Sequence, residues 1–131
     1  GSGHIAQFVR IGSIVLANTH IKWAPADSTG HIGVRQAEEL IDNLGSDNAV
    51  LFADCNDRPG GPVRQVIEKA GFVNLTGAMP TALVDQKPIA IDLLAVRGIT
   101  GKDLTPIYDL RQIPNTTCPS DHIPLEAELN M

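Results

Sequence analysis

Cysteine, basic side chains and long apolar runs are all scarce in this chain of 131 residues, and each shortage excludes a class of protein. The two cysteines, Cys55 and Cys118, are too few for a disulfide framework and lack the spacing of a zinc site. We therefore expect free thiols. Because each cysteine lies inside a polar cluster described below, a redox-sensitive pair is the alternative.

Basic residues are outnumbered, with 10 Lys and Arg against 15 Asp and Glu, and the formal net charge is −5. Proteins that wrap nucleic acid neutralise its phosphates with a basic surface. An acidic chain is poorly suited to that mode of binding, so any nucleic acid would be held locally and through metal. The acidic charge also favours a small or single-stranded substrate.

No apolar run approaches the ~18 residues that a membrane-spanning helix needs, and the first residues do not form a basic segment followed by an apolar core. We expect residues 1–4 to be a leader outside the fold. Residues 5–131 are expected to form one domain, because 43% hydrophobic and 19% charged residues are typical of a globular protein of this length. A cytoplasmic setting is the default expectation.

Short apolar runs bounded by turn residues predict strands at residues 5–9, 11–17, 49–53 and 89–96, another strand within 104–113, and a last one at 123–129. The continuously apolar runs are typical of strands that are buried on both faces. The last run alternates apolar and polar residues, which is typical of a half-buried strand. The pattern favours an α/β (α+β) fold.

Two amphipathic helices are expected between these strands. The first has apolar residues at helical spacing: Ala37, Leu40, Ile41 and Leu44. Ser28 or Thr29 is expected to cap its start, and Gly45 to end it. Pro62 opens the second helix, and Gly71 stops it.

Two helices are too few to cover both faces of the predicted sheet, and they are most simply placed on one face. The other face, rich in Val, Ile, Leu and Phe, is expected to lack a partner within this chain. An apolar sheet face exposed to water becomes an association surface. We therefore expect either a second copy, forming a homodimer, or a missing segment to cover it.

Polar clusters follow several of the predicted strands, so that their side chains line one rim of the sheet. Adjacent Asp121 and His122 combine a carboxylate with an imidazole, which together can hold a cation and a phosphate. The segment from Asp54 to Gly60 has the composition of a turn as well as that of a site. Asp92 lies within an apolar run, where a carboxylate is costly unless it is paired; a salt bridge to an arginine, Arg97 or Arg111, is the structural alternative.

Four clusters at sensible spacing resemble the endonuclease/exonuclease/phosphatase (DNase I-like) superfamily: Asn18-Thr19-His20, Asp54-Cys55-Asn56, Ile91-Asp92-Leu93 and Ser120-Asp121-His122. The resemblance covers nearly the whole chain after the leader, but only the C-terminal half of the family's domain. It implies half of a four-layer α/β/β/α sandwich, a Mg²⁺ (or Mn²⁺) cofactor and hydrolysis of a phosphoester, in a nuclease, phosphodiesterase or phosphatase. The substrate is not specified, because the family uses one site on many phosphoesters.

The same resemblance implies roles for individual residues. Asp54 would activate the attacking water, and Asn56 would hold a phosphate oxygen. His122 would bind the scissile phosphate while Asp92 orients its ring. The remaining three residues have assigned roles too: Asp121 would bind the metal, His20 would be a second catalytic phosphate ligand, and Asn18 would support substrate binding beside it.

The sequence departs from the family pattern in three ways. Ala53 replaces a glycine, and Cys55 replaces an apolar residue. No segment before Asn18 can carry the metal-binding Glu of the family's N-terminal half, so metal affinity is expected to be weak. The alternative function is a non-catalytic association half-module that lost the metal site and pairs sheet to sheet.

Several other side chains carry no motif of their own. Trp23, with Lys22 and Arg35, could form a substrate-facing platform, or it could pack against the first helix. Glu38 and Glu39 are expected to be solvated on that helix. The two remaining histidines, His4 and His31, are expected to lie at the surface.

Overall fold

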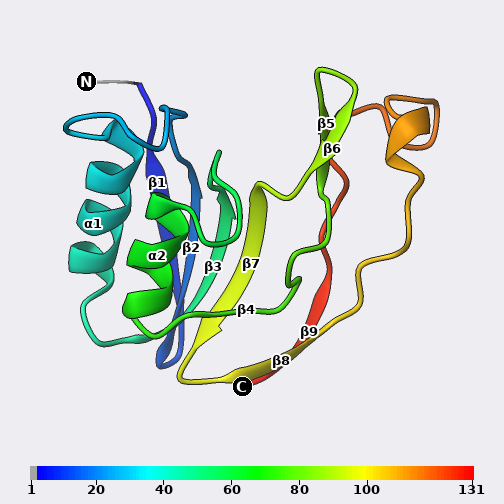
Figure 1. Cartoon of the computed structure of the whole chain (residues 1–131). Coiled ribbons are helices and arrows are strands. Elements are labelled where there is room, and N and C mark those ends of the chain that lie inside the picture. The colour runs from blue at the N-terminus through cyan, green and yellow to red at the C-terminus, as the bar shows by residue number, and fades with distance from the viewer. Residues whose placement is uncertain (1–2) are drawn as a thin grey trace.

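The protein is described here by a computed structural model, which covers residues 3–131 (Figure 1). A five-stranded sheet forms its centre, in the strand order β1-β2-β3-β7-β4. These strands are β1 (Ala6–Ile11), β2 (Ile14–His20), β3 (Asn48–Asp54), β7 (Asp92–Arg97) and β4 (Val73–Asn74). Only β2 and β3 run parallel, and every other neighbouring pair is antiparallel. The leader expected at residues 1–4 falls partly on residues 1 and 2, which lie outside the described residues.

Both helices, α1 (Ile32–Leu44) and α2 (Pro62–Lys69), pack on one face of this sheet, as the sequence predicted (Figure 1). α1 connects β2 to β3, because parallel neighbours need a crossover that returns the chain to the starting edge. Leu40 and Leu44 of α1 and Ile67 of α2 are buried against Leu51 and other residues of the sheet. Within residues 3–131, no helix is both long and apolar enough to cross a membrane.

The start of α1 differs from the expectation. His31, not Ser28 or Thr29, is the N-cap, and its Nδ1 accepts a hydrogen bond of 3.2 Å from the backbone N–H of Val34. The hydroxyl of Ser28 instead donates to the carbonyl of Pro25 within the preceding loop. Imidazole can replace a hydroxyl here because capping needs only an acceptor near the free N–H groups. His31, expected at the surface, is half-buried and has a capping role that the sequence did not indicate.

The second half of the chain forms two small two-stranded sheets. One pairs β5 (Ala82–Val84) with β6 (Lys87–Ile89), and the other pairs β8 (Thr100–Asp103) with β9 (Ala127–Asn130). The predicted strand at 89–96 is divided between β6 and β7. No strand lies within 104–113, where Pro106 cannot donate to a ladder and residues Leu110–Gln112 form the 3₁₀ helix η1. The last predicted strand is confined to β9.

The second face of the central sheet is only partly exposed, which corrects the expectation that the chain leaves it bare. Val50, Leu94 and Val96 are buried on this face, and the side chains that cover them come from the part of the chain that follows β4. The covering side chains are Leu75, Ile99, Leu125, Ala127 and Leu129. The β8–β9 sheet and the segments around it therefore form a partial second layer over β3 and β7.

The same face stays open over β1, β2 and the edge of β3. Val9, Ile11 and Phe52 are 57%, 48% and 37% exposed, and Leu16 lies half-buried among them. Val9 pairs with Leu16 in the β1–β2 register, and Phe52 pairs with Asn18, so these side chains share one face. We call Val9, Ile11, Leu16 and Phe52 the open strip. It is the part of the face for which the expectation of a missing cover holds.

Candidate active site

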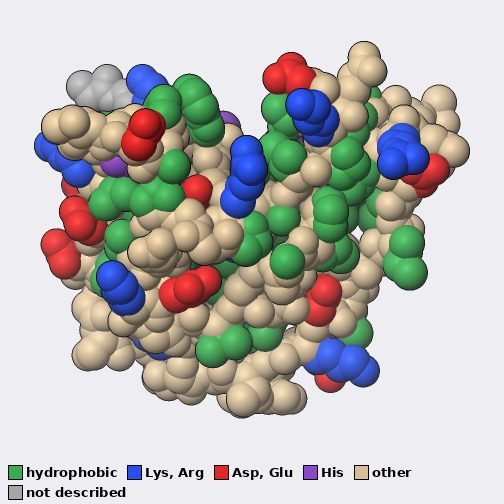
Figure 2. Space-filling view, viewed as in Figure 1, with side chains coloured by type: hydrophobic (Ala, Val, Ile, Leu, Met, Phe, Trp, Pro, Cys, Tyr) green, Lys and Arg blue, Asp and Glu red, His purple; other side chains and the backbone are tan. Residues whose placement is uncertain are grey.

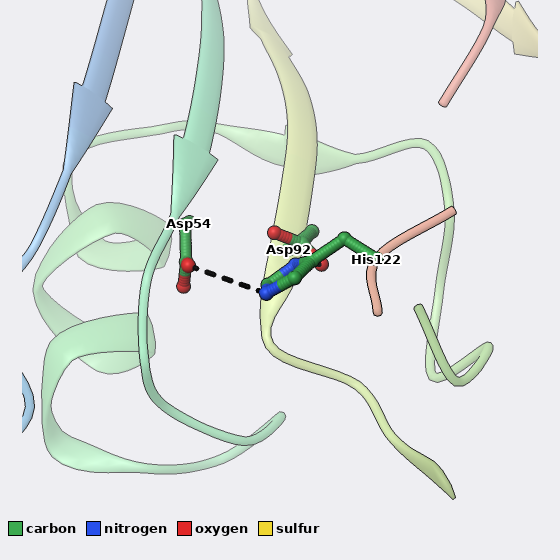
Figure 3. A group of neighbouring side chains, drawn as sticks. All are labelled: Asp54, Asp92 and His122. Atoms are coloured by element: carbon green, nitrogen blue, oxygen red, sulfur yellow. Dashed lines mark hydrogen bonds and ion pairs between the residues drawn. The ribbon is translucent and has the colours of Figure 1, made fainter. Parts of the chain in front are cut away.

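The strand register brings three of the predicted site residues to one end of the sheet. His20 ends β2 and pairs with Asp54, which ends β3, and Asp54 in turn pairs with Asp92, which begins β7. Parallel β2 and β3 finish at the same edge, and antiparallel β7 starts there. His122 reaches this edge from the segment between η1 and β9, and its ring points toward the Asp54 carboxylate (Figure 3).

Asp92 and His122 form the tightest contact of the site. The Nδ1 atom of His122 lies 2.8 Å from Oδ2 of Asp92, and both side chains are largely removed from water. An ionised carboxylate can only accept, so Nδ1 donates, and Nε2 faces the cleft. Arg97 instead donates to backbone carbonyls such as that of Asp47, and among residues 3–131 no arginine forms an ion pair with Asp92. The partner of Asp92 is therefore the histidine.

Asp54 lies between the two histidines. Its Oδ1 accepts a 3.0 Å hydrogen bond from the backbone N–H of Asn56. Its Oδ2 lies 3.3 Å from Nε2 of His20 and 3.8 Å from Nε2 of His122. Burial raises the pKa of Asp54, and the negative charge of Asp92 raises it further, against the lowering effects of the Asn56 hydrogen bond and the two histidines. This carboxylate is thus a better proton acceptor than an ordinary aspartate.

Asn56 is held where it can reach the same space. Its backbone adopts a left-handed conformation with φ of 46°, as a tight turn requires, so the segment is a turn as well as part of the site. Its side-chain amide donates to the carbonyl of Ile21 at 2.8 Å and lies 3.0 Å from Nε2 of His20. Without a proton, Nε2 of His20 can accept from this amide, and with a proton on Nε2 the same atom can donate to Asp54.

The charge state of His122 is set by its neighbours. Burial lowers the pKa of His122, but the hydrogen bond to Asp92 and the negative charges of Asp92, Asp54 and Asp121 outweigh it, and the net shift is upward. The imidazolium form, with a proton on each nitrogen, is therefore populated to higher pH than in an ordinary histidine. In that form Nε2 can donate to an anion in the cleft.

Asp54, Asp92 and His122 are also the group best placed to hold a metal ion, with donor atoms within 4.8 Å of one another. Two carboxylates and an imidazole suit a small divalent cation. Asp121, the metal ligand expected from the sequence, is not in this group. Its side chain is exposed, and its backbone carbonyl accepts from the N–H of Leu83. Its role as a ligand stays a prediction.

Two hollows adjoin the clustered side chains. One, of about 530 Å³, is lined by His20 and Asp54 together with Asn18, the exposed residue two positions before His20 on the same side of β2. Another, of about 770 Å³, continues from Asn56 along the loops, where Trp23 is 63% exposed and does not pack into the core. Figure 2 shows this face hollowed between the helix side and the β5–β6 hairpin.

Sequence reasoning missed one further histidine at the site. The ring of His4 meets that of His20 edge-on, with centroids 5.2 Å apart, so His4 is half-buried and not the free surface residue expected. No spacing or motif marks it, because the contact depends on how the chain enters β1. Asp57 also has an unforeseen role, since its Oδ2 accepts the N–H groups of Val63 and Arg64 at the start of α2.

Both cysteines are free and buried. Burial raises the pKa of Cys55 to about 12, so its thiol stays protonated beside the site. Cys118 packs with the apolar residues of the His122 segment and lies within 3.6 Å of the carbonyl of His122. Buried thiols are inert, which favours the expectation of free cysteines over a redox pair.

Known proteins match this chain in fold but not in sequence. No protein-family model matches the chain, and no curated protein matches its sequence. The structure of ANGEL2, a 2′,3′-cyclic phosphatase in complex with adenosine-2′,3′-vanadate, matches 96% of this chain with a TM-score of 0.73 and 16% identity. The human Nocturnin catalytic domain with bound sulfate matches 97% of it, with a TM-score of 0.62 and 16% identity.

A third structure carries the family's name. The endonuclease/exonuclease/phosphatase family protein from Bacteroides thetaiotaomicron matches 88% of this chain, with a TM-score of 0.57 and 19% identity. The chain spans only 61%, 52% and 49% of these three neighbours, respectively. The resemblance seen in the sequence is thus confirmed at the level of the fold: this chain has the endonuclease/exonuclease/phosphatase fold, over about half the length of those proteins.

Proposed function

We propose that the chain provides the hydrolytic residues of a metal-dependent phosphoester hydrolase of the nuclease, phosphodiesterase or phosphatase type. The arrangement that carries the proposal is a carboxylate with a raised pKa, Asp54, facing a histidine, His122, whose far nitrogen is held by Asp92. A base and an anion-binding donor across one hollow suit attack of water on a bound phosphate. The neighbours described above support the same reaction class.

In this mechanism Asp54 takes a proton from the water that attacks phosphorus. His122, protonated on both nitrogens, donates from Nε2 to a phosphate oxygen and stabilises the charge that grows as the ester bond breaks. Asp92 keeps the ring oriented through the 2.8 Å contact at Nδ1. His20 and Asn56 contact the phosphate from the side of β2.

Substrate contacts beyond the phosphate are proposed from the hollow around Asn18. The exposed amide of this residue lies beside His20 and can bind a polar group next to the phosphate. The net charge of −5 favours a small or single-stranded phosphoester over one that needs a broad basic surface.

A divalent cation, Mg²⁺ or Mn²⁺, is proposed as the cofactor. The oxygen-rich group of Asp54 and Asp92 fits such an ion, and the exposed carboxylate of Asp121 is one residue from His122. When bound, the cation would neutralise phosphate charge. Few protein carboxylates are available, so we expect weak affinity.

A second candidate function is a non-catalytic association module, which the open strip favours. Whether or not the chain is catalytic, we propose that the strip is covered by a second polypeptide layer. A second copy in a homodimer is one source of this layer, and the part of the domain that the chain does not span is the other.

Replacing Asp54 or His122 should abolish hydrolysis. We expect Asp54→Asn and His122→Ala each to reduce the turnover of a model phosphodiester by roughly 10²-fold or more in the presence of Mg²⁺, because each removes a proton-transfer or charge-stabilising group. Asp27→Asn, at an exposed loop carboxylate, is the control and should have no effect. Unchanged activity in the first two variants would refute the proposed mechanism. Inactivity of the natural sequence, with or without a partner layer, would favour the association module.

The pKa of His122 tests its partnership with Asp92. In chelator-treated protein, an NMR titration of the His122 ring should have its midpoint above the ordinary value of 6.5, and Asp92→Asn should lower that midpoint. Because the folded pKa is raised, protonated His122 stabilises the fold fully below its unfolded pKa, and this contribution is lost as the pH rises through the folded pKa. A midpoint unchanged in Asp92→Asn would contradict the assignment.

The metal ligand can be identified by titrating Mn²⁺ into the chain and following water proton relaxation. If Asp121 is a ligand, Asp121→Asn should weaken binding about tenfold, because one of few carboxylates is lost. Asp85→Asn, at another exposed aspartate, is the control. Weakening by Asp54→Asn but not by Asp121→Asn would assign the metal to the clustered carboxylates and would show the sequence-based prediction to be wrong.

The proposed cover of the open strip is tested by molar mass. If a second copy covers it, light scattering behind a sizing column should give a dimer, and Phe52→Glu should give a monomer because a charge cannot be buried unpaired. Val73→Glu is the control, at a 63% exposed residue of β4 away from the strip. A monomeric natural sequence would exclude self-association and leave a separate chain segment as the cover.

A further inference from the structure

Thr81, which no motif marks, is the junction between the two segments that carry Asp92 and His122. Its side chain is fully buried, and it is one of few polar residues in the interior. Its Oγ1 accepts two backbone N–H groups, that of Ile91 at 3.2 Å and that of Asp92 at 3.0 Å. The hydroxyl therefore fixes the backbone at the residue whose carboxylate holds the histidine.

The backbone of Thr81 holds the other segment. Its carbonyl accepts from the N–H of Ile123 at 2.8 Å, and its own N–H donates to the carbonyl of Ile89 at 2.8 Å. The next residue, Ala82, forms an isolated bridge with His122. The His122 segment is thus fastened along β5 as a short additional strand, directly beside the point where Asp92 is fastened.

Asp92 also pairs with Asp54 in the central sheet, whereas among the described residues only β5 pairs with the His122 segment. The chain leaves the β5–β6 hairpin at Ile89 and enters the central sheet only at Asp92, and residues 113–126 contain no strand. The 2.8 Å contact between Asp92 and His122 joins side chains 30 residues apart, so it depends on the spacing of two backbones. Thr81 is the residue that bonds to both.

We propose that Thr81 is a positioning residue for the Asp92–His122 pair: its hydroxyl and its backbone together set the distance and the orientation at which the histidine ring meets its carboxylate. The effect on catalysis rests on the proposed function. The effect of Thr81 on the Asp92–His122 contact can be tested without measuring activity. Misplacement of a catalytic group by about 1 Å can cost on the order of 100-fold in rate. Loss of the Thr81 hydrogen bonds is therefore expected to lower turnover.

Two substitutions separate the hydroxyl from the shape of the side chain. Thr81→Val keeps the branched shape and removes the acceptor, and Thr81→Ser keeps the acceptor and removes a methyl group. Thr76→Val is the matched control, because Thr76 is the other buried threonine and its hydroxyl bonds to Asn74, away from the site. All three changes cost buried packing or a buried hydrogen bond.

The first measurement is made on chelator-treated protein by NMR, at a pH above the titration of His122. The ¹⁵N shifts of the His122 ring should report the Nδ1–H tautomer in the natural sequence, in Thr81→Ser and in Thr76→Val. In Thr81→Val they should report a mixture of tautomers, because Asp92 no longer meets the ring at a fixed distance. A folded Thr81→Val protein with the same ring shifts as the natural sequence would overturn the proposal.

The second measurement is turnover of the model phosphodiester with Mg²⁺. We expect kcat to fall about 100-fold in Thr81→Val with a smaller change in KM, and to recover in Thr81→Ser. An inactive natural sequence would refute the proposed function, and the ring tautomer would still decide the role of Thr81. If Thr81→Val does not fold, Thr81→Cys replaces it, because a thiol is a weaker acceptor. A partly mixed tautomer would then support the proposal, and unchanged ring shifts would overturn it.

Discussion

The parallel pairing of β2 with β3 is the constraint on which the site depends. In a sheet that is otherwise antiparallel, this one pair brings the ends of two strands to the same edge, and the residues placed there are His20 and Asp54. The antiparallel neighbour β7 then begins with Asp92 at that edge. A crossover through α1 is what makes the parallel pair possible, so the amphipathic face of that helix is a requirement of the site as well as of the core.

The ion-pair partners of Asp54 and Asp92 within residues 3–131 are imidazoles, those of His20 and His122. Asp54 and Asp92 oppose each other in the register, and like charges at that separation repel. His122 lies between them, with one nitrogen toward each carboxylate. Arginine would make such a balance permanent, whereas histidine can change its charge near neutral pH. The arrangement thus keeps proton transfer available.

The sequence allowed the strand ends and their polar residues to be predicted, because buried runs and the residues that follow them are local signals. His20 and Asp54 could be placed in this way, and Asp92 was singled out because a carboxylate within an apolar run is costly unless it is paired. The N-cap at His31 and the contact of His4 could not, because each depends on how separate segments meet. Pro106 interrupts the segment at 104–113 that resembled a strand, and Pro114 follows it directly. The covering of Val50 by the C-terminal segment is a tertiary event that periodicity does not encode.

The open strip and the hollow beside His20 and Asp54 are not separate surfaces. Gln7 and Asn18 line both the apolar depression over Phe52 and the hollow that contains His20 and Asp54. A layer placed on the strip would therefore become a wall of the catalytic cleft and would exclude water from one side of it. Under the proposed function, assembly and chemistry would be coupled through these two residues, so that specific activity per chain would depend on protein concentration whenever the covering layer comes from another molecule.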